Sequence, residues 1–198
     1  MIQQFKQSIY LASRSPRRRE LLAQIGVRFE VLEFDVDEAI AADESARSYV
    51  ERLARAKAEA GWLHMQQKNL PVAAVLGVDT TVAVDGRILG KPADRREAAQ
   101  MLGALSGRLH QVLTAIALKF ESRLESALSV SEVRFRPLPE EEIRTYVATG
   151  ECDDKAGAYA VQGRAARFVA ELRGSFSGVM GLPLCETARL VRLMELPA

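Results

Sequence analysis

The stretch Val72-Ala73-Ala74-Val75-Leu76-Gly77-Val78-Asp79-Thr80-Thr81-Val82-Ala83-Val84 decides the fold of this 198-residue chain. It is apolar and rich in β-branched residues, which predicts a long and largely buried β-strand. Asp85-Gly86 follows directly and is typical of a hairpin turn, so we expect residues 87–89 to return as a second strand.

Asp79 is the only charged residue in this predicted strand. A buried carboxylate without a partner is unfavourable, so we expect its side chain to face a cleft, a metal ion or a lysine. The hairpin return brings Lys91 toward the part of the first strand that carries Asp79. A structural aspartate in a salt bridge is the alternative interpretation.

The rest of the sequence predicts an α/β protein with a mixed β-sheet and flanking helices. Strands are predicted at residues 8–12, 29–34, 72–84, 87–89, 111–119, 128–135 and 166–173. Helices are predicted at residues 16–25, 44–67, 94–105, 139–149 and 182–194. Helices and strands alternate at first and a run of strands follows, which is typical of a mixed sheet. Because no repeat or long linker interrupts the chain, we expect one domain over residues 1–198.

The composition is that of an ordinary globular protein, with 48% hydrophobic and 27% charged residues. The formal net charge of +1 provides no overall field for a nucleic-acid backbone, so we expect no stable nucleic-acid binding. Cys152 and Cys185 fit neither a metal site nor a disulfide framework, which favours a reducing cytoplasm. Met1–Gln7 is polar, unlike a signal peptide, and no apolar stretch approaches membrane-spanning length, so no membrane partner is expected.

Residues 9–22 predict a short strand, a tight turn and the start of a helix, with Ser15 as the N-cap and Pro16 at the first helical position. Arg17, Arg18 and Arg19 then occupy the first turn, where the helix dipole disfavours cations. A helix N-terminus reinforced with arginines is suited to binding phosphate. Arg18 lies on the stripe of the buried leucines and Arg17 at its edge, whereas Arg19 is expected to face solvent.

Lys57 lies in the middle of the apolar stripe of the predicted helix 44–67. A buried ammonium group needs a carboxylate or a phosphate as its partner. Two interpretations stay open from this helix alone. One is phosphate binding, and the other is a structural ion pair with Glu38 or Glu33.

Residues 151–163 combine Asp153 and Asp154 with Lys155, which predicts a loop able to bind ions, although an acidic loop in solvent is more common. Gly157 and Gly163 permit close approach of the backbone. Gln162 offers an amide that can pair with the edge of a nucleobase. Three further side chains receive no catalytic role: His64, His110 and Ser177. Residues 174–178, the segment around Ser177, are expected to be a flexible turn.

These segments resemble the Maf family of nucleoside triphosphate pyrophosphatases from about Tyr10 to Thr187. The similarity is carried by residues 13–18, Asp37-Glu38, Lys57, residues 77–80, residues 90–92, residues 154–159 and residues 181–187. The resemblance implies an elongated mixed sheet with two lobes around a central cleft, similar to the inosine triphosphate pyrophosphatases.

Three positions resemble the branch of the family that acts on dTTP and UTP: Arg17, Thr80 and Gln162. The sister branch, which acts on N7-methylated GTP, carries Trp, Gln and Glu at these places. Arg14 departs from the family pattern, which commonly has a small residue there, and no loss of function is expected from it.

The resemblance also implies the chemistry, in which a triphosphate is hydrolysed to the monophosphate and pyrophosphate. Asp79 is expected to accept the proton of the attacking water, and Glu38 and Asp79 to hold Mg²⁺ or Mn²⁺. Five residues are expected to bind the phosphates: Ser13, Arg18, Lys57, Lys91 and Lys155. Modified pyrimidine triphosphates are included as substrates, and a homodimer is suggested by the family. The alternatives are a pyrophosphatase for N7-methyl-GTP or another non-standard nucleotide, and a non-catalytic nucleotide-binding regulator of cell division.

Overall fold

A computed structural model of the protein describes residues 7–195, so most of the polar start Met1–Gln7 lies outside the described residues. The described chain forms one seven-stranded sheet in the order β2-β1-β3-β5-β6-β7, with β4 paired to β3. The first three strands of that order are parallel, and the other pairs are antiparallel. The predicted α/β fold with a mixed sheet is confirmed.

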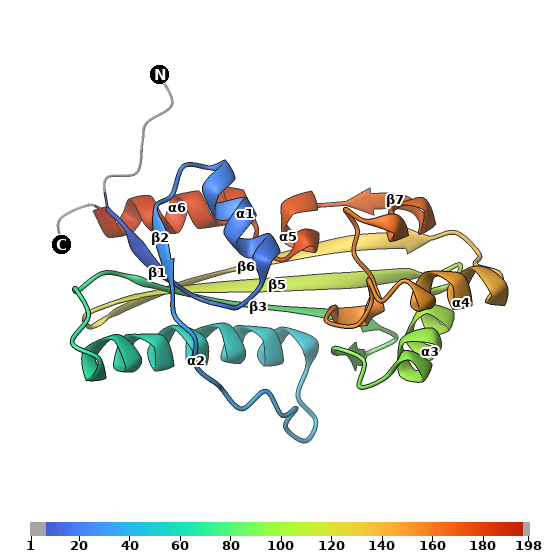
Figure 1. The fold of residues 1–198 in the computed structure, drawn as a ribbon, viewed down its shortest axis with the longest axis horizontal. Coiled ribbons are helices and arrows are strands. Elements are labelled where there is room, and N and C mark those ends of the chain that lie inside the picture. Colours follow the sequence, from blue (N-terminus) through green and yellow to red (C-terminus); the bar gives the residue numbers. More distant parts are fainter. Residues whose placement is uncertain (1–6, 196–198) are drawn as a thin grey trace.

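The strands are β1 (Ile9–Ala12), β2 (Phe29–Val31), β3 (Val75–Val84), β4 (Arg87–Leu89), β5 (Leu109–Phe120), β6 (Arg123–Phe135) and β7 (Val169–Arg173). The α-helices are α1 (Pro16–Gln24), α2 (Ala46–Gln67), α3 (Arg95–Leu105), α4 (Glu140–Ala148), α5 (Phe176–Met180) and α6 (Leu184–Glu195). Two 3-10 helices, η1 (Ala156–Ala158) and η2 (Arg164–Phe168), lie between α4 and β7. In Figure 1, α2 covers one face of the elongated sheet, α5 and α6 cover the other, and α3 and α4 lie at one end.

The hairpin predicted at Asp85-Gly86 joins β3 to β4. Both turn residues have positive φ, +50° and +75°, as the tight turn of a two-residue hairpin requires. The hairpin explains why the chain reverses immediately after the long central strand.

Gly77 sets how closely α2 approaches the sheet. A Cβ atom at this position would lie 2.2 Å from the backbone oxygen of Ala54 and 2.4 Å from the backbone nitrogen of Ala58. The helix backbone therefore rests directly on β3, two residues before Asp79. Lys57 precedes Ala58, so this contact also brings Lys57 to the level of the strand carboxylate.

The hydrophobic core changes partner along β3. Val78 packs in a cluster with α1 and α6, whereas Val82 packs in a second cluster with α3 and α4. Thr80 lies between these two clusters on the same face of β3, whereas Asp79 lies on the opposite face, against α2. The expected arrangement of two lobes is therefore present, and the polar residues of β3 lie where the lobes meet.

Two expectations were wrong near the C-terminal end. Residues 174–178 are not a flexible turn, because Ser175 accepts a hydrogen bond from the Gly178 amide and begins the short helix α5. The strand expected from residue 166 begins at Val169, since residues 164–168 form η2. Elsewhere, the strand expected at 128–135 starts at Arg123, because a hairpin extends its pairing with β5.

We expect Gly77→Ala to lower the free energy of unfolding by about 3 kcal/mol, because the added methyl group meets backbone atoms that cannot rotate away. Urea unfolding measures the change. Gly103→Ala is the matched control, since it lies in α3 with nothing within 4 Å of its Cβ position, and it should raise stability by roughly 0.5–1 kcal/mol. Equal stability of both variants would show that the α2–β3 contact is not tight.

Candidate active site

A cavity of about 580 Å³ lies at the junction of the two lobes. It is lined by the loop after β1, the start of α1, the loop from β2 to α2, the middle of β3 and the segment around η1. Every residue that the sequence analysis assigned to the site lines it: Ser13, Arg17, Arg18, Glu38, Lys57, Asp79, Thr80, Lys91, Lys155 and Gln162. Segments separated by up to 149 positions in sequence (162 − 13) therefore converge on one cavity.

The centre of the cavity is an ammonium group between two carboxylates. Lys57 Nζ lies 2.7 Å from Asp79 Oδ1 and 2.6 Å from Glu38 Oε1. The side chains of Lys57 and Asp79 are only 13% and 9% exposed, whereas that of Glu38 is 42% exposed. The ion-pair interpretation of Lys57 is thus confirmed with Glu38 as one partner, and the pair itself lies inside the cavity.

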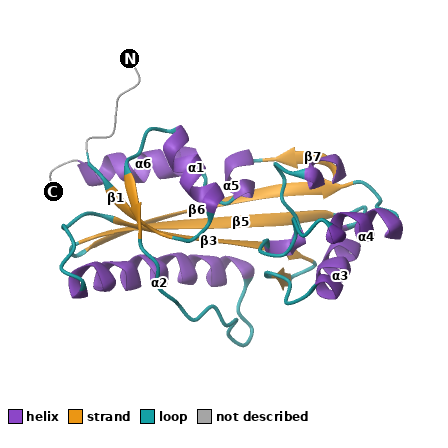
Figure 2. Cartoon of the chain, in the orientation of Figure 1, coloured by secondary structure: helices purple, strands orange, loops and turns teal. Residues whose placement is uncertain are grey.

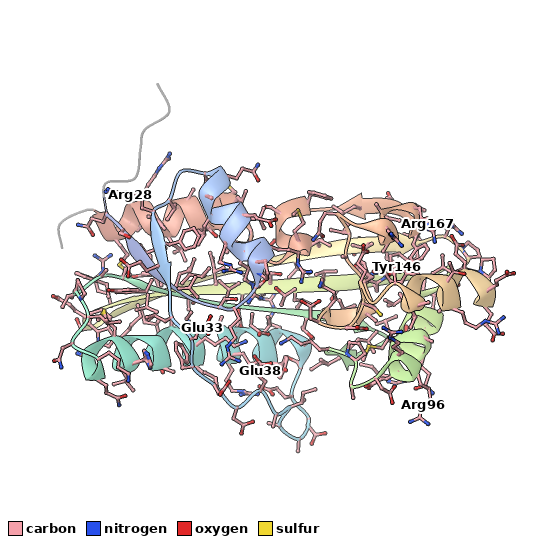
Figure 3. The ribbon with its side chains drawn as sticks, in the orientation of Figure 1. Arg28, Glu33, Glu38, Arg96, Tyr146 and Arg167 are labelled. Atoms are coloured by element: carbon pink, nitrogen blue, oxygen red, sulfur yellow. The ribbon has the colours of Figure 1, made fainter. Side chains whose placement is uncertain are left out.

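Glu38 reaches Lys57 from the long loop between β2 and α2, which passes beside α2 in Figure 2. Two residues of α2 hold this loop. Tyr49 donates its hydroxyl proton to the Glu38 carbonyl oxygen at 3.0 Å, and Arg52 donates to the Ala39 carbonyl oxygen at 2.9 Å. Lys91 Nζ lies 3.7 Å from the second Glu38 oxygen. Figure 3 shows Glu38 near α2 and Glu33 earlier in the same loop, closer to β2.

The two carboxyl groups have opposite pKa shifts. Burial raises the pKa of Asp79, and the charges of Lys57 and Arg18 oppose this shift without cancelling it. Burial also raises the pKa of Glu38, but its hydrogen bond from Lys57 and the charges of Lys57 and Lys91 outweigh burial and lower the pKa overall. Burial therefore dominates at Asp79, and the neighbouring cations dominate at Glu38. A pair of carboxyl groups with diverging pKa values is typical of an acid–base site.

Arg18 is held mainly by protein oxygen atoms. Its guanidinium donates to the Gly181 carbonyl oxygen at 2.9 Å, Ser13 Oγ at 2.9 Å, the Val78 carbonyl oxygen at 3.1 Å and Thr80 Oγ1 at 3.1 Å. Four of its five N–H donors are thereby used, which leaves one for a ligand. Arg18 therefore joins α1, β3 and the end of α5 around the cavity.

The other arginines of the first turn lie as the helical stripe predicts. Arg17 is half-buried and lines the cavity, and Arg19 is exposed. Ser15 is the N-cap residue of α1, as expected, but its side chain makes no capping hydrogen bond. Ser13 Oγ instead accepts a hydrogen bond from the Ser15 amide at 3.3 Å, so Ser13 closes the turn.

The segment from residue 151 to residue 163 forms the wall opposite α1. Lys155 is largely buried and pairs with the exposed Asp154. Gly157 has a φ of +67°, and a Cβ atom there would lie 2.8 Å from Val82, so the close approach inferred for this glycine is confirmed. Gln162 is exposed and lines the cavity.

The residues given no catalytic role are structural. His110 is buried, lies 2.9 Å from the Tyr159 hydroxyl, and has its pKa lowered to about 4 by burial. His64 stacks near Phe34. Ser177 Oγ accepts from the Leu184 amide at 3.1 Å, so it caps the start of α6.

Sequence reasoning missed Thr114, which is 1% exposed. Thr114 donates to the Gly178 carbonyl oxygen at 2.8 Å and lies 3.0 Å from Thr80 Oγ1. Because the Thr114 proton is used, Thr80 must be the donor in the bond between them, and it accepts from Arg18. Thr114 lies opposite Thr80 in the β3–β5 register, which the sequence does not reveal.

The family profile described as Maf-like protein matches residues 8–194. The chain belongs to the Maf family. The dTTP/UTP pyrophosphatase of Aromatoleum aromaticum is 59% identical over 198 residues, which cover 96% of each chain. The dTTP/UTP pyrophosphatase of Nitrosomonas europaea is 52% identical over 191 residues, which cover 92% of each chain.

A more distant likeness is to the structure of the Staphylococcus aureus Ham1 protein. The TM-score is 0.42 and the identity 16%, over 65% of this chain and 72% of that chain. Within residues 7–195, no helix has the length and apolar character needed to cross a membrane.

The opposite pKa shifts of the two carboxyl groups predict opposite effects on stability. A raised pKa means that ionised Asp79 weakens folding at pH 7, and that this loss shrinks as the pH falls through the folded-state pKa. A lowered pKa means that Glu38 stabilises the fold above its unfolded-state pKa and less as the pH falls. We therefore expect Asp79→Asn to unfold at a higher temperature than the wild type at pH 7, and Glu38→Gln at a lower one.

Thermal unfolding followed by circular dichroism between pH 5 and pH 8 measures both differences. The gain from Asp79→Asn should be smaller at the lower end of this range. An Asp79→Asn variant that is less stable than the wild type at pH 7 would show that the ion pair with Lys57 outweighs the burial of Asp79.

Proposed function

We propose that this Maf-family protein is a nucleoside triphosphate pyrophosphatase that hydrolyses dTTP and UTP to the monophosphate and pyrophosphate. The observation that supports this most is the buried Asp79 carboxylate beside Lys57 in a cavity lined by further cations. The names of the two relatives, which cover more than nine-tenths of the chain, support the same substrates. Modified pyrimidine triphosphates with the same base edge belong to the proposed substrate class.

Asp79 is the group that takes the proton from the attacking water. The water oxygen bonds to the α phosphorus, and the bond from the α phosphorus to the bridging oxygen breaks. Pyrophosphate leaves with that bridging oxygen. A base with a raised pKa is suited to this step because it holds the proton more firmly at neutral pH. The neighbouring Lys57 lies where it also offsets the negative charge of the transition state.

Five residues bind the phosphates in this proposal, through the Ser13 hydroxyl, the remaining Arg18 donor and the lysines 57, 91 and 155. Lys91 is exposed at the cavity edge and Lys155 comes from the opposite wall. Since the positive groups surround the cavity on several sides, a triphosphate would meet cations along its whole length. Phosphoryl transfer depends largely on such positioning and charge stabilisation.

A divalent cation, Mg²⁺ or Mn²⁺, fits this site if it arrives with the triphosphate. Among the described residues, no group of three or more His, Cys, Asp and Glu side chains comes together to hold a metal. Glu38 and Asp79 do converge, on Lys57, and Mg²⁺ is commonly held by one or two carboxylates together with substrate phosphates. Glu38 and Asp79 would hold the ion, which would neutralise phosphate charge.

Arg17, Thr80 and Gln162 select the base in this proposal. The Gln162 amide has both a donor and an acceptor, which matches the O4 and N3 edge shared by thymine and uracil. Thr80 acts through position, because its proton goes to Thr114 and it accepts from Arg18. An N7-methyl-GTP pyrophosphatase and a non-catalytic regulator stay less supported alternatives, since the three selecting residues and the buried Asp79 argue for turnover of pyrimidine nucleotides.

We place this activity in the cytoplasm, where free nucleoside triphosphates are abundant. One domain, built on a continuous sheet, would carry it. The homodimer stays a prediction.

Asp79→Asn should lower kcat for dTTP by about 10²–10⁴-fold, because a general base contributes that much. Nucleotide binding should persist, since the lysines and arginines are unchanged. Pyrophosphate release from a panel of triphosphates with Mg²⁺ measures turnover, and calorimetry measures binding. Normal kcat in the variant would remove Asp79 from the mechanism, and a wild type that binds dTTP and UTP without turnover would favour the non-catalytic regulator.

Gln162→Glu should shift the base preference, because the amide donor is replaced by a second acceptor with a negative charge. The ratio of kcat/KM for UTP to that for CTP should fall by roughly tenfold, the effect of about one lost hydrogen bond. Gln111→Glu is the matched control, since Gln111 is exposed on β5 and does not line the cavity. An unchanged ratio in Gln162→Glu would remove Gln162 from base selection.

A further inference from the structure

The turn that carries Gln162 is held on both sides by one pair of side chains. Tyr146, buried on α4, donates its hydroxyl proton to Glu151 Oε1 at 3.0 Å and accepts from the Ala160 amide at 3.2 Å. The other Glu151 oxygen accepts from the Arg164 amide at 3.1 Å. Two backbone amides, two residues before and two residues after Gln162, are therefore tied to the Tyr146–Glu151 pair.

The same carboxylate lies directly under the turn. A Cβ atom on Gly163 would lie 2.5 Å from Glu151 Oε1, so the backbone rests on the carboxylate, and a larger residue at this position would have to push the carboxylate aside. The Gly163 amide donates to the Ala160 carbonyl oxygen at 3.0 Å and closes the turn. Val161 is buried whereas Gln162 is exposed toward the cavity. The contact with Glu151 thus holds the turn that carries Gln162 at the wall of the cavity.

Arg17, the second residue proposed to select the base, lines the same cavity as Gln162. Burial lowers the pKa of Arg17, and the charges of Glu20 and Glu151 are among those that oppose this shift. The contacts of the Glu151 carboxylate are with Tyr146 and with the turn of Gln162. Figure 3 shows Tyr146 nearer than Glu38 to the end of the sheet where α3 and α4 lie.

We propose that Glu151, held by Tyr146, is a positioning residue for base recognition, which sets the turn of Gln162 without lining the cavity itself. This inference rests on the proposed function, and it assigns to the site a carboxylate that takes no part in the chemical step. Glu151 acts on Gln162 through the backbone of the turn. Its loss is expected to reduce selection between bases while turnover of a bound triphosphate continues.

Three variants at different positions test this. Glu151→Gln keeps one accepting oxygen but cannot accept from both Tyr146 and the Arg164 amide. Tyr146→Phe removes the hydroxyl and keeps the ring, and Gly163→Ala places a methyl group against the carboxylate. Arg164→Ala is the matched control, because the bond to Glu151 comes from the Arg164 backbone and its side chain is exposed.

Steady-state kinetics with UTP and CTP give the readout. In each of the three variants, the ratio of kcat/KM for UTP to that for CTP should fall by roughly tenfold, mainly through a higher KM for UTP. The kcat for UTP should stay within about threefold of the wild type, since the phosphate site is unchanged. The control should keep the wild-type ratio. A merely structural role would lower kcat for both substrates alike and leave the ratio unchanged.

The proposal is overturned if folded variants keep the wild-type ratio, or if kcat falls equally with every triphosphate. If Glu151→Gln does not fold, Tyr146→Phe and Gly163→Ala still decide, because they reach the same carboxylate from other positions. Failure of the proposed function is distinguishable, since the wild type itself would then release no pyrophosphate from dTTP or UTP. Base selection would in that case be measured as the ratio of Kd values for the two nucleotides by calorimetry.

Discussion

The contact between Lys57 and Asp79 is the interaction on which the rest of the site depends. It exists because α2 lies directly on β3 at Gly77, where no side chain separates the two backbones. With that spacing, a lysine in the apolar stripe of the helix meets the one carboxylate of the strand at 2.7 Å. Each charge would be unfavourable alone in this buried place, and each is the other's partner. The tight packing of helix on strand therefore places the two buried charged groups of the proposed site beside each other.

The position of the site along the sheet follows from the packing of the core. One strand serves two hydrophobic clusters, with Val78 in the first and Val82 in the second. Between them on the same face Thr80 replaces an apolar side chain, Asp79 lies on the opposite face against α2, and both line the cavity. The discontinuity of the core thus gives polar side chains a rigid support on a buried strand, which holds a site more firmly than a loop would.

Local patterns in the sequence predicted most of the helices and strands, but not α5, η1 or η2. A lone aspartate in an apolar strand, a lysine in an apolar stripe and arginines in a first turn indicated residues that line the cavity, whereas the roles of Ser13 and Thr80 were implied only by the resemblance to the family. The long-range partners could not be predicted, because they depend on register and on contacts between distant segments. Thr114 is opposite Thr80 only because β5 pairs with β3 in one register. The wrong expectation of a flexible turn at residues 174–178 has a local cause, because the bond that begins α5 joins Ser175 to the Gly178 amide only three residues on, and the two glycines that flank it favoured a turn.

Arg18 resolves the anomaly of cations at a helix N-terminus in a way that the sequence pattern did not suggest. Its charge is met first by the carbonyl oxygens of Val78 and Gly181 and by two hydroxyl groups, before any ligand is considered. Burial lowers its pKa while the charge of Asp79 opposes that shift. A guanidinium fixed by four hydrogen bonds cannot rotate to follow a substrate, so its field at the cavity is set before binding. Because the guanidinium is oriented before binding, it does not have to reorganise when negative charge develops on the phosphates. A group oriented in advance lowers a reaction barrier most in this way.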